Sequence, residues 1–503
     1  MLKDWMFFKK DKSSNNDNNK ITEENLKKQD IDINKIKEIL GENSDFIVKE
    51  LDYKHVHLYF IYFETLSDAT TVDTSVLKPI IDMVKSKTNE NTNYSNIDIL
   101  KNMEEGLIPH RSSKIVNNLN DFINSLLTGS LGVVASNIKN EAIAFEVKKI
   151  EKRKVSEPTN ENIIKGSKEA FIEDIKINIA LVRSRIKNPN LKAVKLEVGE
   201  ISKTDITVMY LNDIVDKNLL NKVVEKIKNM KTNNIVAGAD FEEQIIDNKY
   251  SIFPQLIYTE KTDKVVSNIC DGKIAVFIDG LPIVYILPAV ISMFLQAPED
   301  YSENYAVSTM LRVIRFFATI LTLILPGFYI SISIFHQEMI PTDLALSIIH
   351  SKEGEPFPTL VEVIFMLLAF EMLIEASSRL PKTIGQTISI VGGLIIGEAA
   401  VNAKFVSPAV VVIIAITGIT GFLMPNQDFA NSLRLCRFLL VFLSSIAGLY
   451  GLSIGLFMLI YYLCSIESFG VPYLVPFSSS DGKNLMKDTI MRAPLLDMRN
   501  KDK

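Results

Sequence analysis

The sequence predicts an α/β N-terminal region of two soluble subdomains, followed by an α-helical polytopic membrane domain of about five spans. Three observations predict this architecture. The run from Phe316 to Phe335 has twenty residues without a charge, and about 20 apolar residues cross the hydrocarbon core of a bilayer. Further apolar runs follow up to Cys464, whereas helix-like and strand-like patterns alternate before residue 273. A 47% hydrophobic share fits a chain with both a soluble and a membrane part.

Composition and motifs exclude several classes of function. A net charge of -5 without a basic stripe argues against nucleic-acid binding. The three cysteines lie far apart, so neither a disulfide nor a metal site is expected. Only four consecutive apolar residues, Trp5 to Phe8, occur near the N-terminus, so we expect no signal peptide and a cytoplasmic N-terminal region. Phosphate-binding, nucleophile-elbow and H-E-x-x-H motifs are absent from the sequence, which predicts no enzyme and no cofactor.

Composition shifts divide the chain into six parts. The predicted parts are a disordered polar tail (1–30), a first α/β subdomain (31–155), a second α/β subdomain (156–272), a hairpin with an interfacial element (273–315), the membrane domain (316–464) and a C-terminal tail (465–503).

The soluble part shows clear local patterns. Apolar residues from Ile33 to Leu40 recur with helical spacing, and Gly41 ends that helix. Strands are predicted at 55–63, 131–135, 142–147, 193–197 and 205–210. A long amphipathic helix is predicted from Ser167 to Lys187, and a hairpin turn at Asp279-Gly280.

The apolar run from Ile283 to Ala297 has fifteen residues, which favours a re-entrant or interfacial element over a full span. Acidic residues at 299, 300 and 303 are then expected to return the chain to water. The predicted spans are 316–335, 360–376, 384–401, 406–424 and 438–464. Basic residues at 312, 315, 379, 382, 434 and 437 would lie in cytoplasmic loops, as the positive-inside rule predicts. Five spans nevertheless leave the basic C-terminal tail outside, so its side stays open.

Small residues recur on two of the predicted spans. Gly385, Ser389, Gly393 and Gly397 form one stripe, and Ser444, Gly448, Gly451 and Gly455 form another. Small side chains let membrane helices approach closely. Both packing within one subunit and contact between subunits explain these stripes.

Charged residues also occur inside the predicted spans. Glu371, Glu375 and Arg379 follow at steps of four, so they form one polar ridge, and Glu398 lies near the outer end of the third span. Charges in hydrocarbon cost a few kcal/mol or more each and usually face protein or water. A structural Glu375–Arg379 ion pair and an ion pathway are the two interpretations.

Several sequence blocks resemble those of the GerA-type spore germinant receptor A-subunit family. Phe335–Thr342 (FHQEMIPT) resembles its FHxEMIPT block, and His336, Glu338 and Pro341 are the candidate functional residues of this loop. Lys352–Pro358 (KEGEPFP) resembles its REGVPFP-type block. Similar stretches occur at 379–385 and 390–401, and upstream at 183–186 and 296–301. Lys352 departs from the commoner Arg.

The resemblance implies a multi-pass receptor subunit in the spore inner membrane, with its N-terminal region in the spore core. It implies partners, namely a permease-like B subunit and a lipoprotein C subunit, and it is compatible with homo-oligomers in contact with membrane lipid. Assembly, signalling and a contribution to ion release are the roles implied for such a subunit. An accessory paralogue linked to the dipicolinate-release channel is the alternative, and a secondary transporter is a weaker one because no inverted repeat is evident.

Overall fold

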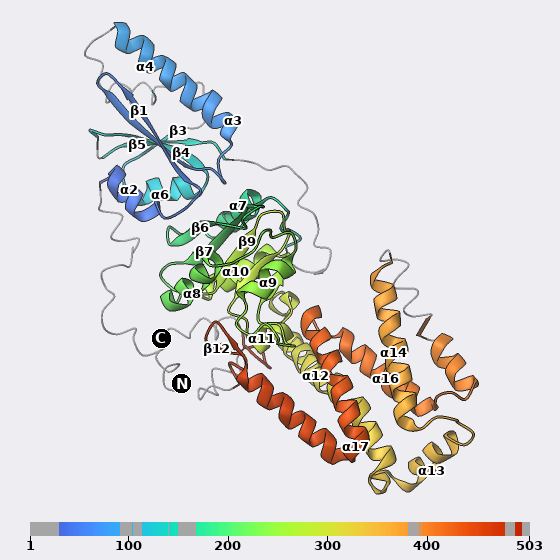
Figure 1. The fold of residues 1–503 in the computed structure, drawn as a ribbon. Helices are drawn as coiled ribbons and strands as arrows, with labels where there is room; N and C mark the ends of the chain where they lie inside the picture. Colours follow the sequence, from blue (N-terminus) through green and yellow to red (C-terminus); the bar gives the residue numbers. More distant parts are fainter. Residues whose placement is uncertain are drawn as a thin grey trace. The chain divides into compact units, whose positions relative to one another are not determined.

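The computed structural model describes residues 30–90, 103, 113–138, 140–148, 167–380, 392–393, 395–477 and 488–494. The predicted disordered tail (1–30) lies outside them except for Asp30. The chain forms two compact units: one contains two β-sheets, and the other contains the helical region with its flanking segments (Figure 1).

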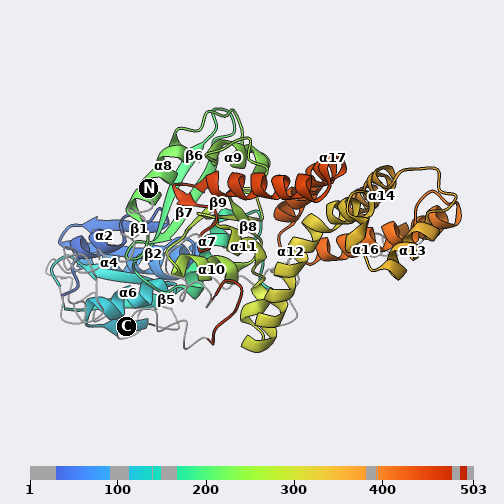
Figure 2. The same ribbon diagram turned by 90° about the horizontal axis from the view of Figure 1, so that it is seen from below.

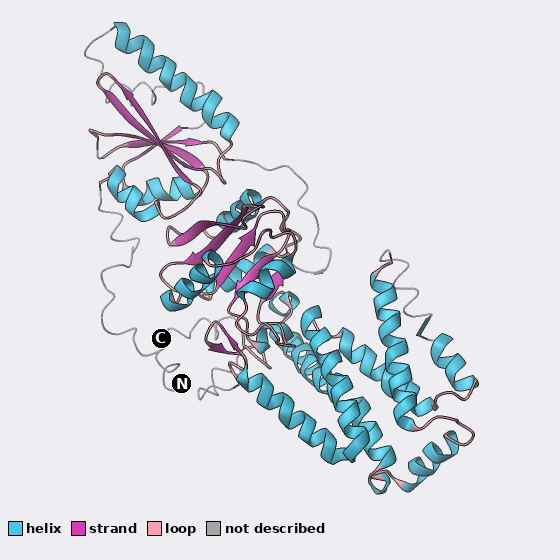
Figure 3. Cartoon of the chain, viewed as in Figure 1, coloured by secondary structure: helices cyan, strands magenta, loops and turns pink. Residues whose placement is uncertain are grey.

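The first sheet is antiparallel and has helices on both of its faces (Figure 3). Its strands are β1 (Phe46–Tyr53), β2 (Val56–Phe63), β3 (Ser113–Val116), β4 (Ser130–Ala135) and β5 (Ala142–Glu146), in the order β1-β2-β4-β5-β3. All four neighbouring pairs are antiparallel. The helices are α2 (Ile33–Leu40), α3 (Ala69–Thr71), the π-helix η3 (Val72–Leu77), α4 (Lys78–Glu90) and α6 (Leu119–Leu127).

Strand β2 shows why both faces are covered. Leu58 and Phe60 pack with η3 and α4 on one face, and Ile61 and Phe63 pack with α2 and α6 on the other. Because side chains alternate along a strand, this needs apolar residues at consecutive positions. The run predicted at 55–63 supplies them, and the strand is confirmed.

The second sheet has the same number of strands. They are β6 (Leu191–Val198), β7 (Thr204–Leu211), β8 (Ile257–Thr259), β9 (Ile274–Ile278) and β10 (Val284–Leu287), in the order β6-β7-β9-β10-β8. Its helices are α7 (Ile175–Arg185), α8 (Lys217–Lys228), α9 (Gly238–Ile245) and α10 (Thr262–Cys270). The pairs β6–β7, β7–β9 and β9–β10 are antiparallel.

Two predictions about this sheet were wrong in part. The helix expected from Ser167 begins at Ile175, because the Asp174 side chain caps it and the preceding chain extends to bond Glu260 and Lys261. The apolar run 283–297 is not one membrane element. Its first part is β10, buried because it pairs with β9 across the predicted turn, where Gly280 has φ +82°. Its second part is the short helix α11 (Ile291–Leu295).

A buried ion pair joins the two sheets of this unit. Arg183 of α7 donates to both carboxylate oxygens of Asp45, at 2.7 and 2.8 Å, and its side chain is 1% exposed. The Arg183 guanidinium also stacks on the Phe63 ring, with its carbon 4.6 Å from the ring centroid. An arginine with a bidentate carboxylate partner tolerates such burial.

The helical unit contains the apolar runs. Its elements are α11, the 3₁₀ turn η4 (Pro298–Tyr301), α12 (Tyr305–Ile334), η5 (Gln337–Met339), α13 (Thr342–Ser351), α14 (Thr359–Ser378), α16 (Pro408–Phe422), α17 (Gln427–Ser465), and the short strands β11 (Glu467–Ser468) and β12 (Val471–Pro472). Two of its helices, α12 and α17, are long and apolar enough to cross a membrane. The predicted span 360–376 lies in α14, which carries three glutamates. The span 406–424 corresponds to the fifteen-residue α16, and half of 384–401, namely 384–391 and 394, lies outside the described residues.

Helix α17 reverses direction in its middle (Figure 2). Ala447 and Gly448 leave helical geometry, and Gly448 has φ +59°. Phe429 near one end and Tyr462 near the other both contact the Phe253 ring, at centroid distances of 5.9 and 6.3 Å. In a straight helix these two residues would lie about 50 Å apart. The predicted span 438–464 is therefore wrong as a single helix, since α17 is a hairpin of two arms.

Candidate functional site

A charge pair with a deeply buried arginine joins α14 to the first arm of α17. Arg437 donates to Glu371 at 2.5 Å, and the Arg437 side chain is only 2% exposed. Arg434 lies 3.6 Å from the second oxygen of the same carboxylate. The prediction that Arg434 and Arg437 lie in a loop was wrong, because α17 begins at Gln427 and takes both inside the helix. Two arginines thus face one carboxylate that comes from another helix.

The predicted ridge on α14 separates into two unlike parts. Arg379, at the C-cap of α14, bonds Glu375 four residues earlier at 2.5 Å, and both side chains are mostly exposed. Glu371 instead bonds α17. The Glu375–Arg379 pair is thus a local surface contact, which is the structural interpretation of the ridge.

The remaining predicted charged and motif residues are more exposed. Glu398 is exposed on the helical stretch 395–402. Glu338 and Pro341 are exposed around η5 and the start of α13. His336 is half-buried: a Cβ built on Gly448 would lie 3.0 Å from its imidazole Cε1, so His336 contacts the reversal of α17. Among the described residues, no group of three or more His, Cys, Asp or Glu side chains could hold a metal ion.

The second small-residue stripe packs within the subunit. A Cβ at Gly451 would lie 2.1 Å from the Leu443 carbonyl oxygen, and one at Gly455 would lie 2.5 Å from Leu440. Both neighbours belong to the other arm of α17, so these glycines let the arms approach. Ser444 packs against Gly327 of α12, where an added Cβ would lie 2.7 Å from the Ser444 hydroxyl oxygen.

The first stripe is only partly described. Gly385 and Ser389 lie outside the described residues. A Cβ at Gly397 would meet Val411 of α16 at 3.2 Å, whereas one at Gly393 would meet nothing within 4 Å. Gly393 therefore has no packing partner within the described part of the chain.

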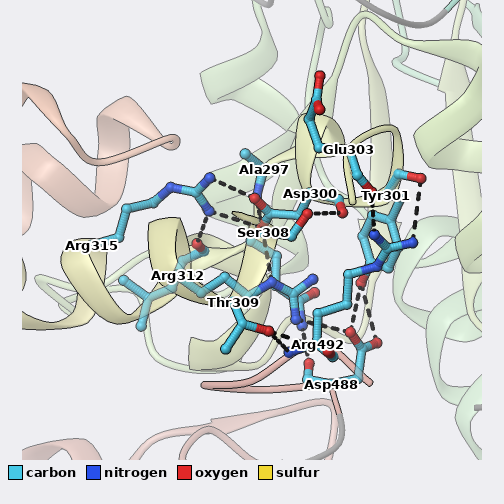
Figure 4. A network of polar contacts seen from close by, with 12 residues as sticks. Ala297, Asp300, Tyr301, Glu303, Ser308, Thr309, Arg312, Arg315, Asp488 and Arg492 are labelled. Carbon is cyan, nitrogen blue, oxygen red and sulfur yellow. Dashed lines mark hydrogen bonds and ion pairs between the residues drawn. The ribbon is translucent and has the colours of Figure 1, made fainter. Parts of the chain in front are cut away.

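A second buried network surrounds the start of α12 (Figure 4). Asp300, at 1% exposure, accepts from Arg312 Nε at 2.9 Å and from Arg315 Nη1 and Nη2 at 2.8 and 2.5 Å. The expectation that Asp300 returns the chain to water was wrong, because the η4 turn directs its carboxylate toward α12. Burial alone would raise the pKa of Asp300, but the hydrogen bonds and charges of Arg315 and Arg312 outweigh it and lower the pKa.

The C-terminal segment completes this network. Asp488 accepts from Arg312 Nη1 at 2.9 Å and from the Tyr301 hydroxyl at 3.1 Å. Arg492 donates through its backbone N–H to Thr309 at 3.1 Å and through Nη1 to the Glu303 carbonyl at 2.6 Å. Burial, followed by the Asp488 charge, raises the pKa of Tyr301. Residues nearly 190 positions apart are thus held together at the base of α12.

The sequence indicated some of these residues without indicating their contacts. The sequence predicts Arg312 and Arg315 only as loop charges, and Asp300 only as part of the block 296–301 and as a residue that returns the chain to water. The spacing of Arg312 and Arg315, three apart with Asp300 twelve residues before Arg312, is the signal that could have suggested the Asp300 contacts. No local spacing in the sequence predicts the contacts of Asp488 or Arg492, whose partners lie more than 170 positions earlier.

Comparisons with known proteins agree with the sequence blocks. Residues 34–503 match the family model described as "Bacillus/Clostridium GerA spore germination protein". The chain is 35% identical to spore germination protein KA of Bacillus subtilis over 91% of this chain and 83% of that protein. It is 34% identical to spore germination protein A1 of the same organism, over 92% and 93%.

A solved structure is also similar in part. The N-terminal domain of the A subunit of the Bacillus megaterium spore germinant receptor GerK3 is 25% identical and aligns with a TM-score of 0.40, over 51% of this chain and 93% of that one. The family match over nearly the whole length decides the assignment. The chain belongs to the GerA family of spore germination proteins.

Proposed function

We propose that this protein is a non-enzymatic A subunit of a germinant receptor in the spore inner membrane, where it assembles with B and C subunits to trigger germination. Membership of the GerA family and the two long apolar helices support this proposal. The observation that carries the ion-release part is the Glu371–Arg437 pair, because charges buried between apolar helices are typical of ion and proton pathways. Its simpler role is to fix α14 against α17.

The ion-release part is tested with Glu371→Gln in spores. The substitution removes the carboxylate that faces Arg434 and Arg437, so we expect altered early release of monovalent cations after a germinant is added. Glu375→Gln is the matched control, because it removes a carboxylate from the same helix at an exposed pair. Cation release like that of the parent strain in the Glu371→Gln spores would remove the ion-pathway role.

The reversal of α17 suggests a topology with six crossings. We assign them to α12, α14, the span 384–401 predicted from the sequence, α16 and the two arms of α17. An even number returns the C-terminal tail to the side on which α12 begins. This agrees with the contacts of Tyr473 and Asp488 with residues just before and within the start of α12. It also places the basic tail on the cytoplasmic side, as the positive-inside rule expects.

Cysteine labelling tests this topology. Cys464, exposed at the end of α17, is kept as the only cysteine and compared with a cysteine at Ser351 in α13. A membrane-impermeant thiol reagent added outside should label Ser351→Cys and spare Cys464 until the membrane is permeabilised. Labelling of both from the outside would contradict the six-crossing topology.

Assembly is tested at the first small-residue stripe. Because nothing described in the chain fills the space at Gly393, Gly393→Leu should fold normally and yet disturb contact with other subunits. Co-purification of the A, B and C subunits and cross-linking between A subunits measure this. Gly455→Leu is the contrasting variant, since it should damage the subunit itself by forcing the arms of α17 apart.

A further inference from the structure

Arg492 is a buried arginine without an acidic partner. Its side chain and backbone are 5% exposed, yet no carboxylate lies within ion-pair distance of its guanidinium among the described residues. The guanidinium donates only to the backbone carbonyls of Glu303 and Tyr301, at 2.6 and 3.5 Å, and Nε has no hydrogen-bond partner. Buried charges normally have a counter-charge, because removing an ion from water is costly.

The neighbouring Arg312 has the same deficiency on one nitrogen. Both guanidinium groups stack on Tyr301, with their central carbons 5.3 and 5.7 Å from the ring centroid. Arg312 donates through Nε to Asp300 and through Nη1 to Asp488, but its buried Nη2 has no hydrogen-bond partner among the residues that the structure describes.

The charges of the network do not balance. Three arginines, at 312, 315 and 492, face two aspartates, at 300 and 488, and Figure 4 shows the Glu303 carboxylate directed away from them. Within the described part of the chain, one positive charge and the buried Nε of Arg492 and Nη2 of Arg312 therefore lack partners. A buried polar group without a partner in a native structure calls for an explanation, and a bound ion is one of them.

We propose that Arg492, together with Nη2 of Arg312, binds the phosphate group of an anionic ligand at the base of α12. Arginine is suited to phosphate because its planar N–H groups bond several oxygens at once. The depth of the site agrees with this ligand. Arg312 lies four residues before the uncharged run that begins at Phe316, which is where the headgroups of a bilayer would lie. The side chains of Tyr305 and Met491 are half exposed nearby on the same two segments, as expected beside lipid.

The phosphate could belong to a lipid headgroup or be free in solution, and one experiment separates the two. The full-length protein is purified in a neutral detergent, and its melting temperature is measured with inorganic phosphate against chloride at equal ionic strength. A second series compares phosphatidylglycerol with phosphatidylcholine in mixed micelles. We expect one phosphate source to raise the melting temperature saturably, since a ligand that binds only the folded state stabilises it.

Variants tie the effect to the site. Arg492→Gln should abolish the shift. Arg492→Lys, which keeps the charge but loses the planar fork, should weaken apparent affinity about tenfold or more. Arg379→Gln should leave the shift unchanged, because it removes one positive charge at an exposed position.

The outcomes are distinct. A shift with phosphatidylglycerol alone supports a lipid headgroup, and a shift with inorganic phosphate supports a free anion. The proposal is overturned if neither raises the melting temperature of the unmodified protein above its control, or if Arg492→Gln or Arg492→Lys keeps the full shift. If Arg492→Gln does not fold, the melting-temperature shifts of the unmodified protein and of Arg492→Lys still test the proposal.

Discussion

Two Glu–Arg ion pairs on α14 have the same closest distance and opposite surroundings. Glu371 and Arg437 approach to 2.5 Å with side chains 22% and 2% exposed, and Glu375 and Arg379 approach to 2.5 Å with side chains 65% and 77% exposed. The first pair joins two helices, and the second lies within one helix and its cap. The distance between nitrogen and oxygen therefore does not distinguish an ion pair that joins two helices from one that lies on the surface.

Burial makes the difference in energy. Exposed ion pairs contribute about 0–1 kcal/mol, because water screens the charges and the side chains lose freedom. Removing one partner of a buried pair costs about 3–5 kcal/mol, because the other charge stays buried and uncompensated. The comparison predicts a graded series of effects across the carboxylates of the helical unit.

The largest effect is expected for Asp300→Asn. This substitution leaves both Arg312 and Arg315 without their most buried partner, so stability should fall by about 3–5 kcal/mol. Thermal unfolding of the full-length protein in detergent measures the loss. Asp488→Asn is the control, because Asp488 is 32% exposed and contacts only one of these arginines, so its loss should be clearly smaller. Equal losses would show that burial does not rank these contacts.

An intermediate effect is expected for Glu371→Gln. The free energy of unfolding should fall by about 2–3 kcal/mol, because the Glu371 side chain is 22% exposed and the pair is therefore less completely buried than the pairs of Asp300. The double variant Glu371→Gln/Arg437→Gln should lose less than the sum of the single variants, because it no longer buries an unpaired charge. The double-mutant cycle in thermal unfolding measures this coupling. Additive losses would mean that the two side chains do not depend on each other.

The stabilisation that the Asp300 carboxylate contributes should depend on pH. Its folded-state pKa is lowered, so its charge stabilises the fold above the ordinary aspartate pKa of about 4, and this contribution is lost as the pH falls through the lower folded value. The stability difference between the unmodified protein and Asp300→Asn should therefore narrow below about pH 4 and stay constant between pH 5 and 7. Melting temperatures of both proteins across this range test it. A difference that narrows above pH 5 would contradict a lowered pKa.

Local patterns predicted the fold better than the site. Helix α2 and strands β2, β4 and β7 follow from apolar periodicity and turn residues, which act over a few positions. The same reasoning found the Glu375–Arg379 pair, because i and i+4 are neighbours on a helix. It could not find the pairing of Glu371 with Arg437, 66 residues apart, because that contact depends on how α14 packs against α17.

The reversal of α17 was missed for a different reason. Glycines at 448, 451 and 455 suit close packing of two helices, and the sequence alone does not say that the two helices are halves of one apolar run. Gly448 was interpreted as a packing position, although its positive φ makes it the turn. Its neighbours Gly451 and Gly455 do pack helices, namely the two arms that the turn creates.

The smallest effect is expected for Glu375→Gln. Loss of an exposed i, i+4 pair should change stability by about 0.3–0.5 kcal/mol, which is close to the error of a melting experiment. Arg379→Gln should behave alike, and the Glu375→Gln/Arg379→Gln cycle should show almost no coupling, in contrast to the cycle at Glu371 and Arg437. Raising the salt concentration should reduce even this small term, whereas the coupling of the buried pair should persist because solvent ions do not reach it. A salt-resistant coupling at Glu375 and Arg379 would contradict the interpretation of this pair as an exposed surface contact.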